Sequence, residues 1–70
     1  MVIDESKLAT VGDNIKATMV DGLIVLVVDP NKDLGMTKSG ANRTVATSRM
    51  FKPLLDNDTV FNLWVGRNLR

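Results

Sequence analysis

Residues 15–28, with the sequence IKATMVDGLIVLVV, form two runs rich in aliphatic and β-branched residues joined by Asp21 and Gly22. Asp-Gly is favoured in two-residue type I′ turns, because both central residues need a positive φ, which glycine accepts freely and aspartate tolerates. We therefore predict a β-hairpin whose turn sets the register. Val20 then pairs with Leu23, and each step outward adds one pair as far as the ends of the stretch.

Alternate residues of this hairpin share a face. One face would carry Ile15, Ala17, Met19, Ile24, Leu26 and Val28, and the other Lys16, Thr18, Val20, Leu23, Val25 and Val27. The second strand is therefore apolar on both sides, and a chain of 70 residues has little material to cover both. We predict that the first face enters the core and that a second copy of the chain covers an interface made of Val20, Leu23, Val25 and Val27.

The absence of two residue types limits the chemistry of the chain. It contains no cysteine and no histidine, which removes disulfides, thiolate metal sites and the commonest general base. Most of its aspartates stand where turns need them, and are not paired for acid–base catalysis. We therefore predict a single domain over residues 1–70 that is not an enzyme, holds no cofactor or metal, and gains stability by forming a homodimer or larger oligomer.

The sequence also suggests where the protein works. The longest apolar run, residues 23–28, is far shorter than the roughly 18 residues of a membrane span. The first residues, MVIDESK, carry acids where a signal peptide carries bases. We expect a soluble, cytoplasmic protein that does not bind membranes.

The remaining segments favour further strands. Residues 8–11 form either a strand that turns at residues 12–14 or part of a short helix capped by Asp4. Residues 42–48 and 59–65 alternate as strands do, whereas Pro30 and its neighbours end the hairpin. We predict an all-β fold: a small antiparallel sheet of four or five strands, with the hairpin at its centre and residues 59–65 beside it, or the same sheet curled toward a barrel.

Charge is distributed unevenly along the chain. Residues 1–35 hold three bases and six acids, whereas residues 36–70 hold six bases and two acids. A basic surface with an aromatic ring is typical of single-stranded nucleic-acid binding. The candidate residues are Lys38, Arg43, Arg49, Lys52 and Arg67, with Trp64 or Phe51 as the stacking ring. The alternative for both rings is burial against a second subunit, or, for Phe51, in the core.

Two interpretations of the function follow from this pattern. The first is a small module that binds single-stranded DNA or RNA as a homo-oligomer without catalysis. The second is a structural or partner-binding protein, such as a viral accessory subunit or an inhibitor of a larger enzyme, in which the basic stretch contacts an acidic protein. Gly35 and Gly40 have the spacing of a phosphate-binding loop, but Ala41 and Asn42 stand where that motif needs lysine and serine or threonine. The loop is then either a plain connection or a contact for a backbone phosphate through Lys38.

The run DPNKDLGMTKSGANRTVATSR, followed by NLWVGRN, resembles a family of very short microbial and viral proteins. Their pattern is a hydrophobic strand, a D-LSK-LG-SxSGK loop, a VAST-like strand and an LNVYRK-like end. The resemblance covers about residues 14–68, and the chain departs from it at Ala41, where the family has lysine, and at residues 64–66. It implies the order of the strands and no particular activity.

Overall fold

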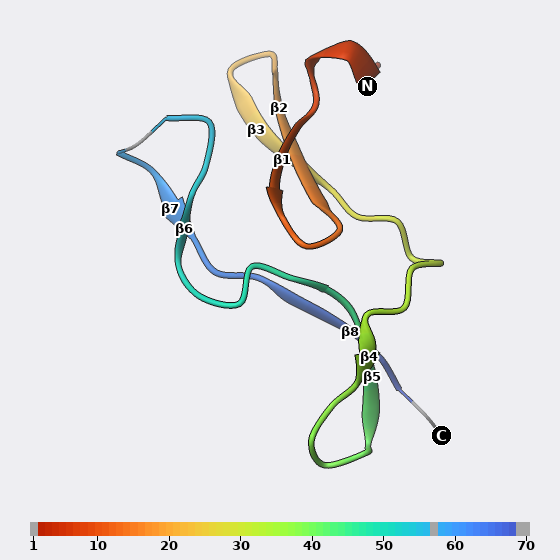
Figure 1. Cartoon of the computed structure of the whole chain (residues 1–70). Helices are drawn as coiled ribbons and strands as arrows, with labels where there is room; N and C mark the ends of the chain where they lie inside the picture. The colour runs from red at the N-terminus through yellow and green to blue at the C-terminus, as the bar shows by residue number, and fades with distance from the viewer. Residues whose placement is uncertain (1, 57, 69–70) are drawn as a thin grey trace.

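The computed structural model describes residues 2–56 and 58–68, and in this part of the chain the fold is all-β without an α-helix (Figure 1). The strands are β1 (Ala9–Gly12), β2 (Ile15–Val20), β3 (Leu23–Val27), β4 (Gly35–Met36), β5 (Asn42–Thr47), β6 (Lys52–Pro53), β7 (Val60–Phe61) and β8 (Trp64–Asn68). All strand pairs are antiparallel. The predicted fold class is confirmed.

The hairpin has the predicted turn and register. Asp21 and Gly22 have φ values of 53° and 77°, as a type I′ turn requires. The ladder between β2 and β3 runs from the pair Val20–Leu23 to the pair Lys16–Val27. Ile15 and Val28 lie just beyond it.

The strands do not form one sheet or a barrel, which corrects the predicted arrangement. They make three separate sheets, in the orders β1-β2-β3, β4-β5-β8 and β6-β7. The predicted strand over residues 59–65 is split between β7 and β8, and its second part pairs with β5 instead of the hairpin. The split lies where the partner strand β5 ends. The Ser48 hydroxyl, just after β5, accepts a hydrogen bond from the Leu63 amide at 3.0 Å, and the segment after Ser48 turns away from β8 at Arg49, where φ is 69°.

The N-terminal segment combines the two predicted alternatives. Asp4 caps a single 3₁₀ turn, Glu5–Lys7, by accepting a hydrogen bond from the amide of Ser6. The chain then enters β1, which pairs with β2. The strand prediction for this segment is confirmed for β1, and the helix is limited to one turn.

The turn between β1 and β2 connects the two larger sheets. Asp13 exchanges backbone hydrogen bonds with Thr47 at 2.9 and 3.1 Å. The side-chain amide of Asn14 donates to the carbonyl oxygens of Asp29 and Val45 at 2.8 and 2.9 Å. This short polar turn therefore holds the end of β3 and the middle of β5 against each other.

The hydrophobic core is small. Its buried apolar residues are Ile15, Ala17, Val45 and Ala46. On the face predicted to be core, Met19, Ile24 and Leu26 remain 52%, 42% and 37% exposed, because no second layer of described residues covers the turn end of the hairpin. On the predicted interface face, Leu23 is 60% exposed, whereas Val20, Val25 and Val27 are half-buried within the chain itself.

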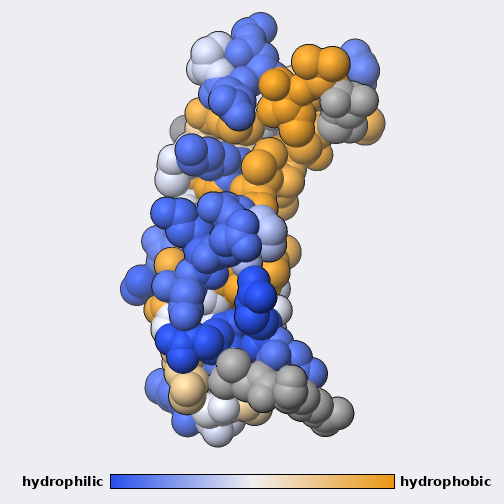
Figure 2. Space-filling view, turned by 90° about the vertical axis from the view of Figure 1, so that its right-hand side faces the viewer, coloured by the Kyte–Doolittle hydropathy of each residue, from blue (hydrophilic) through white to orange (hydrophobic). Residues whose placement is uncertain are grey.

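The molecule is open and elongated, with extents of 38 × 25 × 16 Å. Its radius of gyration is 13.2 Å, against about 11 Å for a compact domain of this length. Its accessible surface is 5233 Å², against about 4,300 Å² for a folded monomer of this mass. Figure 2 shows that apolar side chains gather in the upper half, level with the β1-β2-β3 and β6-β7 sheets of Figure 1, whereas the lower half is mostly hydrophilic.

Candidate nucleic-acid interface

Two arginines lie directly opposite each other on the β4-β5-β8 sheet. Arg43 of β5 pairs with Arg67 of β8 in the antiparallel register, so both side chains project from the same face. A β-bulge at Val45 changes the alternation of β5, because Thr44 pairs with Gly66 and Ala46 already pairs with Val65. Arg43 and Thr47, which simple alternation places on one face, therefore lie on opposite faces.

Each arginine also holds the loop that follows β3. The Nε–H of Arg43 donates to a carboxylate oxygen of Asp33 at 2.6 Å, and Nη2 of Arg67 donates to the carbonyl oxygen of Pro30. The hydrogen bond from Arg43, together with one from the amide of Gly35, lowers the pKa of Asp33 below its usual value. Within the described part of the chain, no residue accepts a hydrogen bond from the two Nη groups of Arg43. The same holds for the Nε and Nη1 groups of Arg67.

A cleft of about 270 Å³ opens between this loop and the sheet. It is lined by Asn31, Lys32, Asp33, Arg43, Val45 and Arg67. A smaller hollow of about 160 Å³ adjoins it and is lined by Val28, Pro30, Val45, Val65, Gly66 and Arg67. Because the two share Val45 and Arg67, the cationic cleft continues into an apolar hollow.

The charge asymmetry of the sequence corresponds to two ends of the molecule. The β4-β5-β8 sheet and its loops, residues 30–47 and 64–68, carry four bases and one acid. Residues 2–29, which contain the β1-β2-β3 sheet, carry two bases and five acids. Lys32 belongs to the basic end although it lies in the acidic half of the sequence. Sequence analysis missed it, since only the folding of the loop over the sheet brings it beside Arg43.

The other predicted bases do not line the arginine cleft, and only one of them lies at its end of the molecule. Lys38 lies at the same end of the molecule, in the exposed loop between β4 and β5. Arg49 binds Asp13 at 2.5 Å near the β1–β2 turn, and Lys52 lies in β6 opposite Phe61. The structure therefore keeps Lys38, Arg43 and Arg67 as one group and separates Arg49 and Lys52 from it.

Neither aromatic candidate faces the arginine pair. Trp64 lies on the opposite face of the sheet, where its indole N–H donates to the Thr44 hydroxyl at 3.3 Å and its ring covers Gly66. It is 50% exposed. Phe51 is 71% exposed near β6, so the alternative that placed it in the core is wrong.

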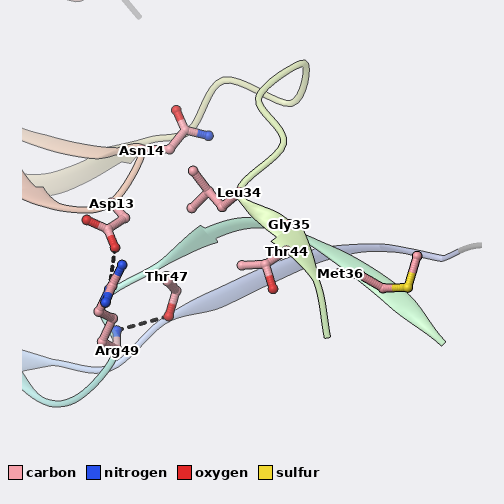
Figure 3. A pocket seen from close by; sticks show the side chains of 8 residues that line it. All are labelled: Asp13, Asn14, Leu34, Gly35, Met36, Thr44, Thr47 and Arg49. Atoms are coloured by element: carbon pink, nitrogen blue, oxygen red, sulfur yellow. Dashed lines mark hydrogen bonds and ion pairs between the residues drawn. The ribbon is translucent and has the colours of Figure 1, made fainter. Parts of the chain in front are cut away.

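A broader hollow of about 580 Å³ lies between the β1–β2 turn and the strands β4 and β5 (Figure 3). Several of its polar groups are bonded within the chain: Asp13 binds the Nε–H of Arg49, the Arg49 amide donates to the Thr47 hydroxyl, and Asn14 bonds the neighbouring carbonyls. It offers a ligand fewer unused donors than the arginine cleft.

Comparisons with protein-family models, curated proteins and solved structures find no match to this chain. The resemblance to the short microbial and viral proteins therefore stays a prediction. Within the described residues, no helix is long and apolar enough to cross a membrane, and no three carboxylates lie together as metal ligands.

Proposed function

We propose that this protein binds single-stranded DNA or RNA without catalysis, as a homo-oligomer whose basic sheet carries the nucleic acid. The observation that carries the proposal is the Arg43–Arg67 pair on the wall of an open cleft, with N–H groups that bond no other described residue. A guanidinium group recognises phosphate through such N–H groups. Lys32 at the cleft and Lys38 in the next loop add positive charge along the path proposed for the bound nucleic acid.

The apolar hollow beside the cleft supports a contact with the rest of the nucleotide. Val28, Pro30 and Val65 offer a base or sugar only apolar surface and no side-chain donor that distinguishes one base from another. Binding should therefore show little sequence preference. The proposed site does not include Trp64, Arg49 or Lys52.

The proposal is tested by titrating a labelled 30-mer with the protein and following fluorescence anisotropy at several salt concentrations. A site that engages about three phosphates on a single strand should give a logarithmic salt slope near −2. Replacing Arg43 and Arg67 together by alanine should abolish most of the affinity. The matched control, Arg49→Ala with Lys52→Ala, removes the same charge elsewhere and should change the affinity much less.

A third variant covers the case in which loss of both arginines unfolds the loop. Asp33→Asn keeps the side-chain oxygen that accepts the Gly35 amide but removes the negative charge that, among the described residues, lines the cleft. Binding should tighten by about fivefold, as expected for removing one repulsion near 4 Å in water. Absence of binding by the wild type at about 50 mM salt, or equal losses in the two double variants, would overturn the proposal.

A second candidate function, a structural or partner-binding subunit, is favoured by the exposed apolar surface. Met50, Phe51 and Val60 are 68%, 71% and 58% exposed around the β6-β7 hairpin. A two-stranded hairpin is marginally stable alone, and a protein partner that covers these side chains would stabilise it. Retention of oligomers by a chain that binds no nucleic acid would favour this second function.

A further inference from the structure

The outer edge of β3 is open for pairing with another strand. β3 lies at the edge of the β1-β2-β3 sheet. Because Val20 and Leu23 close a two-residue turn, Leu23, Val25 and Val27 direct their backbone groups toward β2, and Ile24 and Leu26 direct theirs outward. The outward N–H and C=O groups of Ile24 and Leu26 bond no other part of the described chain.

This edge has none of the features that usually prevent strand pairing. β3 reads LIVLV, with no charge, no proline and no bulge along its pairing with β2. Natural proteins usually protect an exposed edge with a lysine, a proline, a bulge or a covering segment. Leu23, Ile24 and Leu26 are also 60%, 42% and 37% exposed, so apolar side chains stand free on both faces of the edge.

We infer that two copies of the chain join edge to edge through β3, in antiparallel orientation about a two-fold axis at Val25. Ile24 of each copy then pairs with Leu26 of the other, and their outward groups form about four backbone hydrogen bonds. The two three-stranded sheets become one sheet of six strands. Leu23 of each copy lies opposite Val27 of the other, on the same face as Val25.

The surface area of the chain supports a second copy as the occupant. The accessible surface exceeds that of a folded monomer of this mass by about 900 Å². A standard interface buries about 800 Å² on each partner. The symmetric pairing also uses the same apolar edge twice, so that neither copy needs a complementary patch elsewhere.

This interface rests on the self-association in the proposed function and is independent of nucleic-acid binding, so either can fail alone. The test is backbone amide hydrogen exchange followed by NMR at about 20 µM and about 1 mM protein without nucleic acid. The amides of Ile24 and Leu26 should become at least about tenfold more protected at the higher concentration. The amides of Val25 and Val27, which already bond to β2, should change much less.

Two substitutions at one position separate edge pairing from side-chain packing. Ile24→Pro and Ile24→Ala both remove the apolar side chain, but only proline removes the outward N–H and blocks an incoming strand. Sedimentation should give a monomer for Ile24→Pro and a dimer for Ile24→Ala. The inference would be overturned if the Ile24 and Leu26 amides exchanged rapidly at both concentrations, or if Ile24→Pro were a dimer like Ile24→Ala. If Ile24→Pro does not fold, the exchange data decide alone.

Discussion

At the scale of single residues, aspartates shape the loops of this protein. Asp29, Asp33 and Asp56 each accept a hydrogen bond from a backbone amide two residues further on. The sequence predicts this use of aspartate, because Asp side chains readily close such turns. It does not reveal that Asp33 also binds Arg43, since the two lie ten residues apart and meet only when the loop folds over the sheet.

The pairing of Asp33 predicts how stability depends on pH. The hydrogen bonds from Arg43 and Gly35 lower the pKa of Asp33 in the folded chain below the value of 3.8 expected without them. The Asp33 carboxylate therefore takes up a proton less readily in the folded state than in the unfolded state. Its contribution to the free energy of unfolding is complete above the unfolded pKa of 3.8 and is lost as the pH falls through the lower pKa of the folded state. Asp4 and Asp56 follow the same direction because of their own hydrogen bonds.

Urea unfolding from about pH 6 to about pH 2.5 measures this effect. The midpoint should fall in the acid part of the range for the wild type. Asp33→Asn should start with a lower midpoint and fall less steeply, because it loses the charge that binds Arg43 and keeps the acceptor for Gly35. Parallel curves for the two proteins would contradict the assigned role of the Asp33 carboxylate.

At the scale of the elements, the hairpin and the bulge show what sequence reasoning reaches. The Asp21-Gly22 turn determines the β2–β3 register locally, so the pairs follow from counting outward. The bulge at Val45 depends instead on how β5 meets β8, two strands that are far apart in the sequence. It reverses the face of Thr47 relative to Arg43, which the alternation of the sequence does not predict.

The pairing of Trp64 with Gly66 on β8 gives a test at this scale. A Cβ atom added at Gly66 would lie 2.0 Å from Cη2 of Trp64, so the indole ring has to leave the sheet. We expect Gly66→Ala to shift the emission of this single tryptophan to longer wavelength and to lower the free energy of unfolding by about 1–2 kcal/mol, since the ring loses its packing and its bond to Thr44.

Gly22→Ala is the matched control for this prediction. Gly22 has a φ of 77° and no atom within contact of a new Cβ, so alanine there strains the turn by about 1 kcal/mol and leaves Trp64 in place. Its emission should match that of the wild type. An unchanged emission spectrum in Gly66→Ala would show that the ring does not lie over Gly66 in solution.

At the scale of the whole molecule, two polar residues join an acidic, partly apolar end to a basic end. Asp13 and Asn14 link the β1-β2-β3 sheet to β5, and Asn14 also bonds Asp29 just after β3. Among the described residues, the buried apolar core consists of only four. Because the core is so small, these hydrogen bonds supply more of the interaction that holds the β1-β2-β3 and β4-β5-β8 sheets together than they would in a domain with a larger core. The sequence predicts the turn at residues 12–14 but not this role, because its partners lie up to 34 residues away along the chain.

Substitutions at Asn14 should therefore uncouple the two sheets. Asn14 has a φ of 60°, and its side-chain amide bonds two carbonyls. Asn14→Ala loses both bonds and strains the backbone, at a cost of about 2–4 kcal/mol, whereas Asn14→Gly loses the bonds and accepts the conformation, at about 1–3 kcal/mol. The difference between the two variants measures the strain of a Cβ atom at this φ, reduced by the greater freedom of glycine in the unfolded chain.

Unfolding of these variants should be followed with two probes, the fluorescence of Trp64 for the β4-β5-β8 sheet and far-ultraviolet circular dichroism for all strands. Wild-type transitions should coincide, as they do for a cooperative domain. In Asn14→Gly the two midpoints should separate, because the sheets then share mainly the Asp13–Thr47 bonds and a small apolar contact. Coincident transitions in both variants would mean that the four buried apolar residues couple the sheets without Asn14.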